Sequence, residues 1–303
     1  MENMVNNPIL VTGYSGFIGK KITNNLLKSG YSVCGIYNSH RIPDKRNLTQ
    51  VKLDLFNEDE IKHFLQNNHF EKLLHLAWYV GDDCHNSEKN VLWLTSSINL
   101  INNFIKEGGK EVIVSGSNEE YDLSKGYLRE DDIIQNPTSL YGICKKSLYE
   151  ISQKLCNKND VTLKWARIFH TYGVGEQESK LFSSVIRSIL SNKKIELSAC
   201  DNYIDYINVD DVSEAIVCLV KNKESGIFNI CSGETYKLKE IVNYICNRLE
   251  YKGLVYFNAK KSKVNSKILI GDSTKLNSIL GFTPKITLQD GINNLIEWWK
   301  KNV

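Results

Sequence analysis

From residue 9 to residue 169 the chain alternates short apolar runs with longer stretches that carry a helical pattern. Asn57 and Glu60, between two of these runs, have the spacing that marks the start of a helix. Strands that alternate with helices in this way indicate a parallel sheet with helices on both faces. We therefore expect an α/β fold with a doubly wound parallel sheet. The runs with the length and composition of strands are 9–13, 31–37, 49–55, 73–78, 110–117 and 162–169.

Three glycines, Gly13, Gly16 and Gly19, lie between the first predicted strand and the first predicted helix. A strand that turns sharply into a helix leaves backbone amides free at the helix N-terminus, and glycines let a pyrophosphate approach them closely. The spacing is Gly-x-x-Gly-x-x-Gly, which differs from the dinucleotide fingerprint Gly-x-Gly-x-x-Gly. The position of the glycines nevertheless predicts a Rossmann-type sheet that binds a dinucleotide.

The segment TGYSGFIG resembles the cofactor turn of the extended short-chain dehydrogenases/reductases. This family contains NAD(P)-dependent epimerases, dehydratases and reductases of nucleotide sugars, and the resemblance implies a homodimer. It also implies that Asp54-Leu55 lies by the adenine and that Leu76-Ala77, in HLAW where the family usually has HLAA, lines the inner side of the cofactor. The cofactor-binding residues that the resemblance implies are Gly13, Ser15, Gly16, Phe17, Ile18, Gly19, Asp54, Leu55, Leu76 and Ala77.

The residues after the second predicted strand bear on the choice between NAD and NADP. An acidic residue there would hold the ribose diol and repel a 2′-phosphate, but this chain has Tyr37-Asn38-Ser39-His40-Arg41. We expect Asn38 to contact the cofactor. Arg41 either pairs with a 2′-phosphate or is a solvated loop residue. The sequence favours NADP, with NAD as the alternative.

The motif Tyr-x-x-x-Lys occurs three times, as Tyr121/Lys125, Tyr141/Lys145 and Tyr256/Lys260. The first lies in a loop pattern followed by glycine, and the third lies outside the predicted sheet. The second follows Asn-Pro and opens a predicted helix, so its tyrosine and lysine share one helix face. We therefore select Tyr141 and Lys145, which follow Ser117 at the end of the fifth predicted strand.

Ser117, Tyr141 and Lys145 resemble the Ser/Thr and Tyr-x-x-x-Lys catalytic set of the family. A tyrosine pKa of about 10 is too high for a general base at neutral pH. A lysine ammonium and a positively charged nicotinamide favour the phenolate and lower that pKa. We expect Tyr141 to transfer a proton, Lys145 to lower its pKa and hold the nicotinamide ribose, and Ser117 to bind the substrate oxygen.

Asn118 and Glu119 stand where the resemblance places Asp-Glu in 4,6-dehydratases. Such an enzyme needs an acid as well as a base to eliminate water, and Asn118 cannot donate as an acid. The segments SGSNEEYD and HLAW and the final Trp298-Trp299 are more similar to reductases and epimerases of deoxysugar nucleotides.

The predicted substrate-binding residues depart from the pattern of the family. Ile204 stands where many members have an arginine that grips the diphosphate, and Lys263 is the best match to a second arginine. Lys180 and Arg187, which bracket the next predicted helix, are further cations for a diphosphate. His170 is either a pocket residue near the substrate or a core histidine.

The regular alternation of strands and helices ends after Gly175. We expect residues 1–173 to form an NAD(P)-binding domain to which residues 205–231 return. Residues 174–303 are then mainly a smaller, mixed α/β substrate domain.

The favoured function is an NADP-dependent reductase of a nucleotide-activated 4-keto-6-deoxyhexose that makes a sugar for a surface polysaccharide. The alternative is a nucleotide-sugar 4-epimerase that retains NAD. A 4,6-dehydratase and a non-catalytic dinucleotide sensor are less favoured, the sensor because it need not keep Ser117, Tyr141 and Lys145.

Charge and composition exclude several other classes of protein. The 303 residues include 38 basic and 35 acidic side chains, which is too balanced for a nucleic-acid binder. No run approaches the roughly 18 apolar residues of a membrane span, and the first residues lack a secretory pattern, so we expect a cytoplasmic protein. The eight cysteines form no Cys-x-x-Cys pair, which predicts reduced thiols and no metal site.

Overall fold

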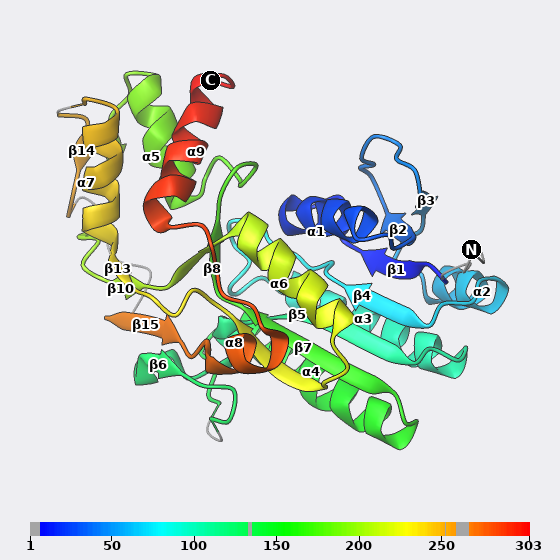
Figure 1. Ribbon diagram of the computed structural model, residues 1–303. Coiled ribbons are helices and arrows are strands. Elements are labelled where there is room, and N and C mark those ends of the chain that lie inside the picture. Colours follow the sequence, from blue (N-terminus) through cyan, green and yellow to red (C-terminus); the bar gives the residue numbers. More distant parts are fainter. Residues whose placement is uncertain (1–6, 133–134, 252, 259–266) are drawn as a thin grey trace. The chain divides into compact units, whose positions relative to one another are not determined.

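The structure is a computed structural model that describes residues 7–132, 135–251, 253–258 and 267–303 (Figure 1). The chain divides into two compact units. The first unit contains Met1–Tyr121, Ile134–Arg167 and Ser213–Phe228. The second unit contains Asp122–Ile133, Ile168–Val212 and Asn229–Val303. Residues 205–231 were expected to return to the sheet domain, and residues 213–228 of this segment belong to the first unit. The assignment of cofactor and substrate to separate domains stays a prediction.

The first unit is built on a seven-stranded sheet with the order β12-β7-β5-β4-β1-β2-β3. The pairs from β3 across to β5 are parallel, which confirms the predicted doubly wound sheet. The chain reverses its direction of progress across the sheet between β1 and β4, and such a switch point is where ligands bind in open α/β sheets. The strands are β1 (Ile9–Thr12), β2 (Val33–Tyr37), β3 (Leu48–Lys52), β4 (Lys72–His75), β5 (Glu111–Ser117), β7 (Thr162–Ile168) and β12 (Gly226–Ile230).

Helices cover both faces of this sheet (Figure 1). On one face, Ile61, Leu100, Phe104 and Leu148 belong to a continuous apolar core shared by the sheet and three helices. On the other face, α1 and α6 are joined by a hydrogen bond from Asn25 to Ser213. The helices of the three-helix face are α2 (Glu58–Asn67), α3 (Lys89–Lys106) and α4 (Leu140–Lys158), and those of the other face are α1 (Phe17–Lys28) and α6 (Val209–Lys221).

Local sequence signals account for the ends of several elements. The Asn57 side chain accepts a hydrogen bond from the Glu60 amide at the start of α2, as the spacing predicts. Ser139 caps α4 in the same way through the Gly142 amide. All four residues of β1 are buried, as expected for a strand of a parallel sheet that is covered on both faces.

The amino-terminal end of the same sheet holds a buried ion pair. Lys164 is fully buried, and its Nζ lies 3.0 Å from Glu111 Oε1. The same ammonium donates to the carbonyls of Leu219 and Asn222 at the end of α6. A cation at the last turn of a helix binds carbonyls that have no partner within the helix.

The described residues of the second unit form short strands and helices. Its largest sheet has the order β13-β10-β15-β6, and β8 pairs with β11 and β9 with β14. The Trp299 indole of the last helix donates to the Ser183 hydroxyl of α5 at 2.8 Å. The strands are β6 (Tyr127–Leu128), β8 (His170–Tyr172), β9 (Ile195–Glu196), β10 (Tyr203–Ile204), β11 (Tyr206–Asn208), β13 (Tyr236–Lys237), β14 (Val255–Tyr256) and β15 (Ile268–Gly271), and the helices are α5 (Leu181–Leu190), α7 (Leu238–Arg248), α8 (Thr274–Leu280) and α9 (Leu288–Lys300).

No helix in the described part of the chain has the length and apolar character needed to span a membrane. The eight cysteines are free thiols, and five of them are buried: Cys34, Cys144, Cys156, Cys200 and Cys231.

Candidate active site

The glycine turn leaves no room for side chains at two of its positions. Gly13 has a φ of +68°, and a Cβ there would lie 2.7 Å from the Ala77 nitrogen. A Cβ on Gly19 would lie 2.0 Å from the Gly13 carbonyl oxygen. Gly16 is exposed and is the N-cap of α1, whose first turn has no acidic residue. An exposed glycine at a helix N-terminus without nearby negative charge fits the pyrophosphate of a dinucleotide.

The other predicted cofactor residues also lie in the first unit. The backbone amides of Leu76 and Ala77 are hydrogen-bonded to the carbonyl and the hydroxyl of Thr12 at the end of β1. Asn38 and Asp54 line one pocket beside β3 and α2. The half-buried residues of the turn are Ser15, Phe17 and Ile18, and Leu55 is buried near the start of α2.

Arg41 is held in an exposed ion pair. Its Nη2 lies 2.6 Å from Asp44 Oδ1, and the two side chains are 51% and 82% exposed. Its guanidinium also lies over the Tyr37 ring, 5.9 Å from the ring centre. The sequence allowed two roles for Arg41, a ligand of a 2′-phosphate or a solvated loop residue. In the structure Arg41 binds the Asp44 carboxylate, which a 2′-phosphate would have to displace.

The structure brings Ser117, Tyr141 and Lys145 together within the first unit. Ser117 ends β5, and Tyr141 and Lys145 occupy the first turns of α4. A hydrogen bond joins Ser117 to the Tyr141 hydroxyl. Lys145 is 2% exposed, and its Nζ donates to the Ser115 carbonyl at 2.9 Å and lies 3.9 Å from the centre of a Trp78 ring.

Burial controls the protonation of this cluster. It raises the pKa of Tyr141 well above its usual value, and the Ser117 hydrogen bond offsets only part of that effect. Burial lowers the pKa of Lys145 to about 7, against the opposing charge of Glu120. Burial and Lys145 lower the pKa of His75 to about 3, so this core histidine is neutral at neutral pH. Contrary to the expectation that Lys145 lowers the Tyr141 pKa, burial raises it, and the charges that act on it are those of Glu120, Glu119 and Cys84.

Asn118, Glu119 and His85 lie beside the cluster of Ser117, Tyr141 and Lys145. Asn118 is 5% exposed, and its Nδ2 has no hydrogen-bond partner among the described residues. Glu119 Oε2 accepts from the Ser139 hydroxyl at 3.1 Å and lies 3.7 Å from His85 Nδ1. His85 was not predicted from the sequence, because its loop carries no motif, although its carbonyl accepts from the Tyr141 amide.

The other two Tyr-x-x-x-Lys motifs lie in different surroundings. Tyr121 is fully buried, with the Arg167 guanidinium 4.2 Å above its ring. Tyr256 lies in β14 of the second unit, and Lys260 lies outside the described residues.

The predicted substrate cations lie in the second unit or outside the described residues. Lys180 is exposed at the start of α5. Arg187 Nη1 lies 2.6 Å from Glu178 Oε2, and its guanidinium lies 5.0 Å from a Trp299 ring centre. Lys263 lies outside the described residues. Ile204 is 1% exposed and pairs with Leu269 and Tyr236 in the small sheet, so it is a core residue of this unit.

His170 is half-buried in β8 of the second unit, where its ring lies 5.6 Å from that of Tyr206.

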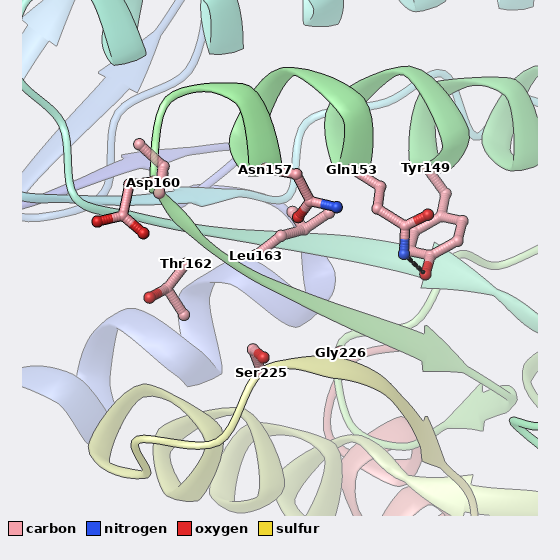
Figure 2. Close-up of a pocket in the computed structure, with 9 residues that line it drawn as sticks. Tyr149, Gln153, Asn157, Asp160, Thr162, Leu163, Ser225 and Gly226 are labelled. Carbon is pink, nitrogen blue, oxygen red and sulfur yellow. Dashed lines mark hydrogen bonds between the residues drawn. The ribbon is translucent and has the colours of Figure 1, made fainter.

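A further polar pocket of the first unit contains none of the predicted site residues. Figure 2 shows it between the second half of α4, β7 and the start of β12, with Gln153 donating to the Tyr149 hydroxyl at 2.6 Å. Its lining consists of Tyr149, Gln153, Asn157, Asp160, Val161, Thr162, Leu163, Ser225 and Gly226.

The fold and the site define a nicotinamide-dependent enzyme of the short-chain dehydrogenase/reductase class. Residues 9–231 match the model of the NAD dependent epimerase/dehydratase family, and the chain belongs to that family. The family predicted from the glycine turn and the Tyr-x-x-x-Lys motif is thereby confirmed.

Individual relatives are distant but cover most of the chain. The chain is 28% identical to the dTDP-6-deoxy-L-talose 4-dehydrogenase (NAD(+)) of Aggregatibacter actinomycetemcomitans, over 77% of this chain and 87% of that protein. It is 22% identical to the UDP-glucuronate 4-epimerase of Thermodesulfobacterium geofontis (strain OPF15), over 97% of this chain and 96% of that protein. The structure of MoeE5 in complex with UDP-glucuronic acid and NAD matches with a TM-score of 0.86 at 23% identity and covers 98% of this chain and 100% of that chain.

Proposed function

We propose that the protein is a reductase that acts on carbon 4 of a nucleotide-activated 4-keto-6-deoxyhexose. The observation that carries this proposal is the raised pKa of the half-buried Tyr141, which keeps the phenol protonated at neutral pH. A reductase needs a proton donor at this position, whereas an epimerase needs the same tyrosine to accept a proton first. The relative named as a 4-dehydrogenase of dTDP-6-deoxy-L-talose supports the same substrate class.

The residues of the cluster would each act on the substrate or the cofactor. The reduced nicotinamide, when bound, supplies the hydride that is added to carbon 4. Tyr141 donates its proton to the oxygen on that carbon, and Ser117 hydrogen-bonds the same oxygen. The buried Asn118 Nδ2 would find its partner in another substrate oxygen, because buried donors in native proteins are almost always satisfied. Lys145 would hold the hydroxyls of the nicotinamide ribose.

A panel of nucleotide 4-keto-6-deoxy sugars tests the reaction. The purified protein should consume added reduced cofactor in proportion to the sugar, measured as loss of the reduced-cofactor absorbance. The Tyr141→Phe variant, tested in parallel, should lose this consumption and keep the fold. A protein that is isolated with NAD bound and converts a hexose to its 4-epimer without added cofactor would contradict the reductase and establish the 4-epimerase alternative.

NADP is the proposed cofactor. The segment after β2 offers no carboxylate at Asn38 or Ser39, and the Arg41–Asp44 pair is exposed. Exposed ion pairs contribute only about 0–1 kcal/mol, so a 2′-phosphate can displace Asp44. Both cofactors belong in the assay, because the dehydrogenase relative is named for NAD(+).

The diphosphate of the substrate is proposed to bind Lys180 and Arg187, with Lys263 as a further cation. A buried diphosphate needs charged donors, because leaving it unpaired costs several kcal/mol. Arg187→Ala should raise the Michaelis constant more than it lowers turnover, because such contacts bind the ground state and the transition state equally. An unchanged Michaelis constant in Arg187→Ala and Lys180→Ala would contradict the assignment.

A homodimer is proposed through α3 and α4, which pack side by side in the first unit. Val91 and Leu92 on α3 and Ile143 and Ile151 on α4 are exposed apolar residues, and a face of this kind favours association. Leu92→Glu should shift the protein from dimer to monomer in sedimentation velocity. Ile279→Glu, at an exposed position on α8, is the control that should leave the oligomeric state unchanged; a wild-type monomer would contradict the proposal.

The cytoplasm is the proposed location, since free thiols persist in a reducing compartment.

A further inference from the structure

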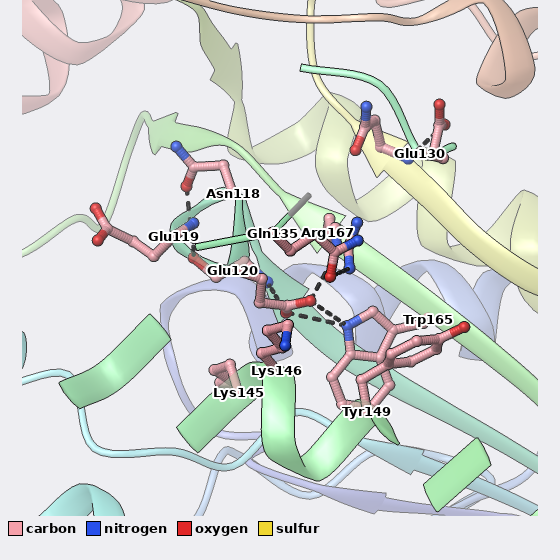
Figure 3. A network of polar contacts seen from close by, with 12 residues as sticks. Asn118, Glu119, Glu120, Glu130, Gln135, Lys145, Lys146, Tyr149, Trp165 and Arg167 are labelled. Atoms are coloured by element: carbon pink, nitrogen blue, oxygen red, sulfur yellow. Dashed lines mark hydrogen bonds and ion pairs between the residues drawn. The ribbon is translucent and has the colours of Figure 1, made fainter. Parts of the chain in front are cut away.

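Glu120 is a buried carboxylate that no step of the proposed reaction uses. It is 0% exposed and lies three residues after Ser117. Figure 3 shows its carboxylate facing Trp165 and Arg167. Its Oε1 accepts from the Ser117 amide at 2.7 Å, and its Oε2 accepts from Arg167 Nε at 2.8 Å. Both oxygens lie 3.0 Å from the Trp165 indole nitrogen. Arg167 is also fully buried and donates to Gln135 at 3.0 Å.

The carboxylate fixes the backbone turn that carries Ser117. The Ser117 hydroxyl accepts from the Glu119 amide at 3.2 Å while the Ser117 amide donates to Glu120. This reciprocal pair is a capping box, which defines how the chain enters the short helix Asn118–Glu120. The direction of the Ser117 hydroxyl is therefore coupled to the Glu120 side chain.

The same carboxylate acts on the buried Lys145. Among the described residues, no carboxylate lies within ion-pair distance of the Lys145 ammonium, whose hydrogen bond goes to the Ser115 carbonyl. The charge that acts on its pKa is that of Glu120, and Lys145 in turn lowers the pKa of His75, which is neutral. Burial lowers the Lys145 pKa and Glu120 raises it. Glu120 also raises the pKa of Tyr141, together with Glu119 and Cys84.

We propose that Glu120 is a positioning residue of the active site, which orients Ser117 through the backbone and supplies the negative charge that acts on the Lys145 ammonium. Arg167 compensates this charge from the opposite side, through β7. The inference rests on the proposed function, in which Ser117 binds the substrate oxygen and Lys145 holds the nicotinamide ribose. The competing interpretation is an ion pair that contributes to folding alone.

Glu120→Gln separates the two interpretations, because glutamine keeps an acceptor for the Ser117 amide and removes the charge. In protein labelled at the lysine side chains and free of cofactor and substrate, NMR titration should place the Lys145 midpoint near pH 7. The signal is assigned by its loss in Lys145→Arg. In Glu120→Gln the midpoint should fall by about one pH unit, the lower end of the effect of a nearby charge.

The same shift predicts a change in the pH profile of the reaction. Well above a pKa, each unit of pKa corresponds to a tenfold change in the charged fraction. The Lys145 ammonium population at pH 8 should therefore fall about tenfold in Glu120→Gln, and the alkaline limb of turnover should move to lower pH by the same interval. A folding ion pair would change the amount of folded enzyme without moving this limb.

Glu111→Gln is the matched control. It removes the carboxylate of the Glu111–Lys164 pair at the other end of the sheet, so it should lower the melting temperature and leave the Lys145 titration unchanged. Glu120→Gln with Arg167→Met removes both charges and avoids an unpaired arginine. It should show the same acidic shift, because Arg167 is not among the charges that act on Lys145 or Tyr141.

An unchanged Lys145 midpoint in a folded Glu120 variant would overturn the proposal. Failure of both the single and the double variant to fold would also overturn it, in favour of a purely structural pair. The titration needs no substrate. A shifted Lys145 signal in a protein that reduces no 4-keto sugar would therefore refute the proposed function and uphold the electrostatic role of Glu120.

Discussion

We expect different effects from alanine substitutions at two glycines of the turn, Gly19 and Gly16. Gly19→Ala would place a Cβ 2.0 Å from the Gly13 carbonyl oxygen, and this backbone atom cannot rotate away as a flexible side chain can. Overpacking of this kind costs about 3 kcal/mol or more, which corresponds to a fall in melting temperature of roughly 6 °C or more. The variant should also lose cofactor binding, because the turn can no longer close.

Gly16→Ala is the matched comparison. Gly16 has an extended backbone with φ −73°, and its Cβ would lie 3.3 Å from the same carbonyl. A contact at 3.3 Å needs a shift of only a few tenths of an ångström, so the melting temperature should fall by much less than in Gly19→Ala. The added methyl group would project where a pyrophosphate approaches the α1 amides. Loss of a charge-assisted hydrogen bond worth roughly 1.5–3 kcal/mol should weaken cofactor binding about ten- to a hundredfold.

Thermal denaturation without cofactor and calorimetric titration with NADP and NAD measure the two effects separately. If Gly19→Ala melts at the same temperature as the wild-type protein, the close approach of α1 to the Gly13 carbonyl is refuted. Wild-type cofactor affinity of Gly16→Ala would refute the placement of the pyrophosphate.

Three further predictions concern the site and its core. Tyr141→Phe should lower turnover by about 10²–10⁴-fold, the usual contribution of a positioned acid–base group, whereas equal loss in Tyr121→Phe would mean that the wrong motif was selected. Arg41→Ala should reduce the preference for NADP about ten- to a hundredfold and Asp44→Asn should increase it; a wild-type enzyme that prefers NAD would contradict both. The pKa of His75 falls from 6.5 to about 3 on folding, so its stabilising effect is present above pH 6.5 and is lost as the pH falls. Below pH 6.5 the unfolding free energy should decrease by about 1.4 kcal/mol per pH unit more in wild type than in His75→Gln, and parallel curves in urea denaturation would disprove the buried neutral histidine.

Local patterns were sufficient to predict the sheet and its helices. The helix start predicted at Asn57 is the N-cap of α2, and the helix predicted to open at Tyr141 is α4. These features depend on neighbours within a few residues, which the sequence displays directly. The glycine turn and Tyr141/Lys145 were found for the same reason.

Contacts between distant segments could not be predicted in this way. Glu120 and Arg167 are 47 residues apart, and nothing in either segment indicates that they form a buried pair. His85 lies beside Glu119 only because its loop contacts the start of α4. Arg41 was judged from the strand before it, and the sequence alone did not indicate that Asp44 would bind it.

The division of the chain into units has a consequence for how it is synthesised. The first unit is assembled from three separate stretches, and the last of these ends at Phe228. A nascent chain that has reached Arg167 still lacks β12, so the backbone groups of β7 would form an open edge of the sheet. Unpaired edges of this kind promote aggregation. The first unit therefore cannot fold completely before most of the chain has been synthesised. No continuous fragment shorter than about three quarters of the chain contains all of it.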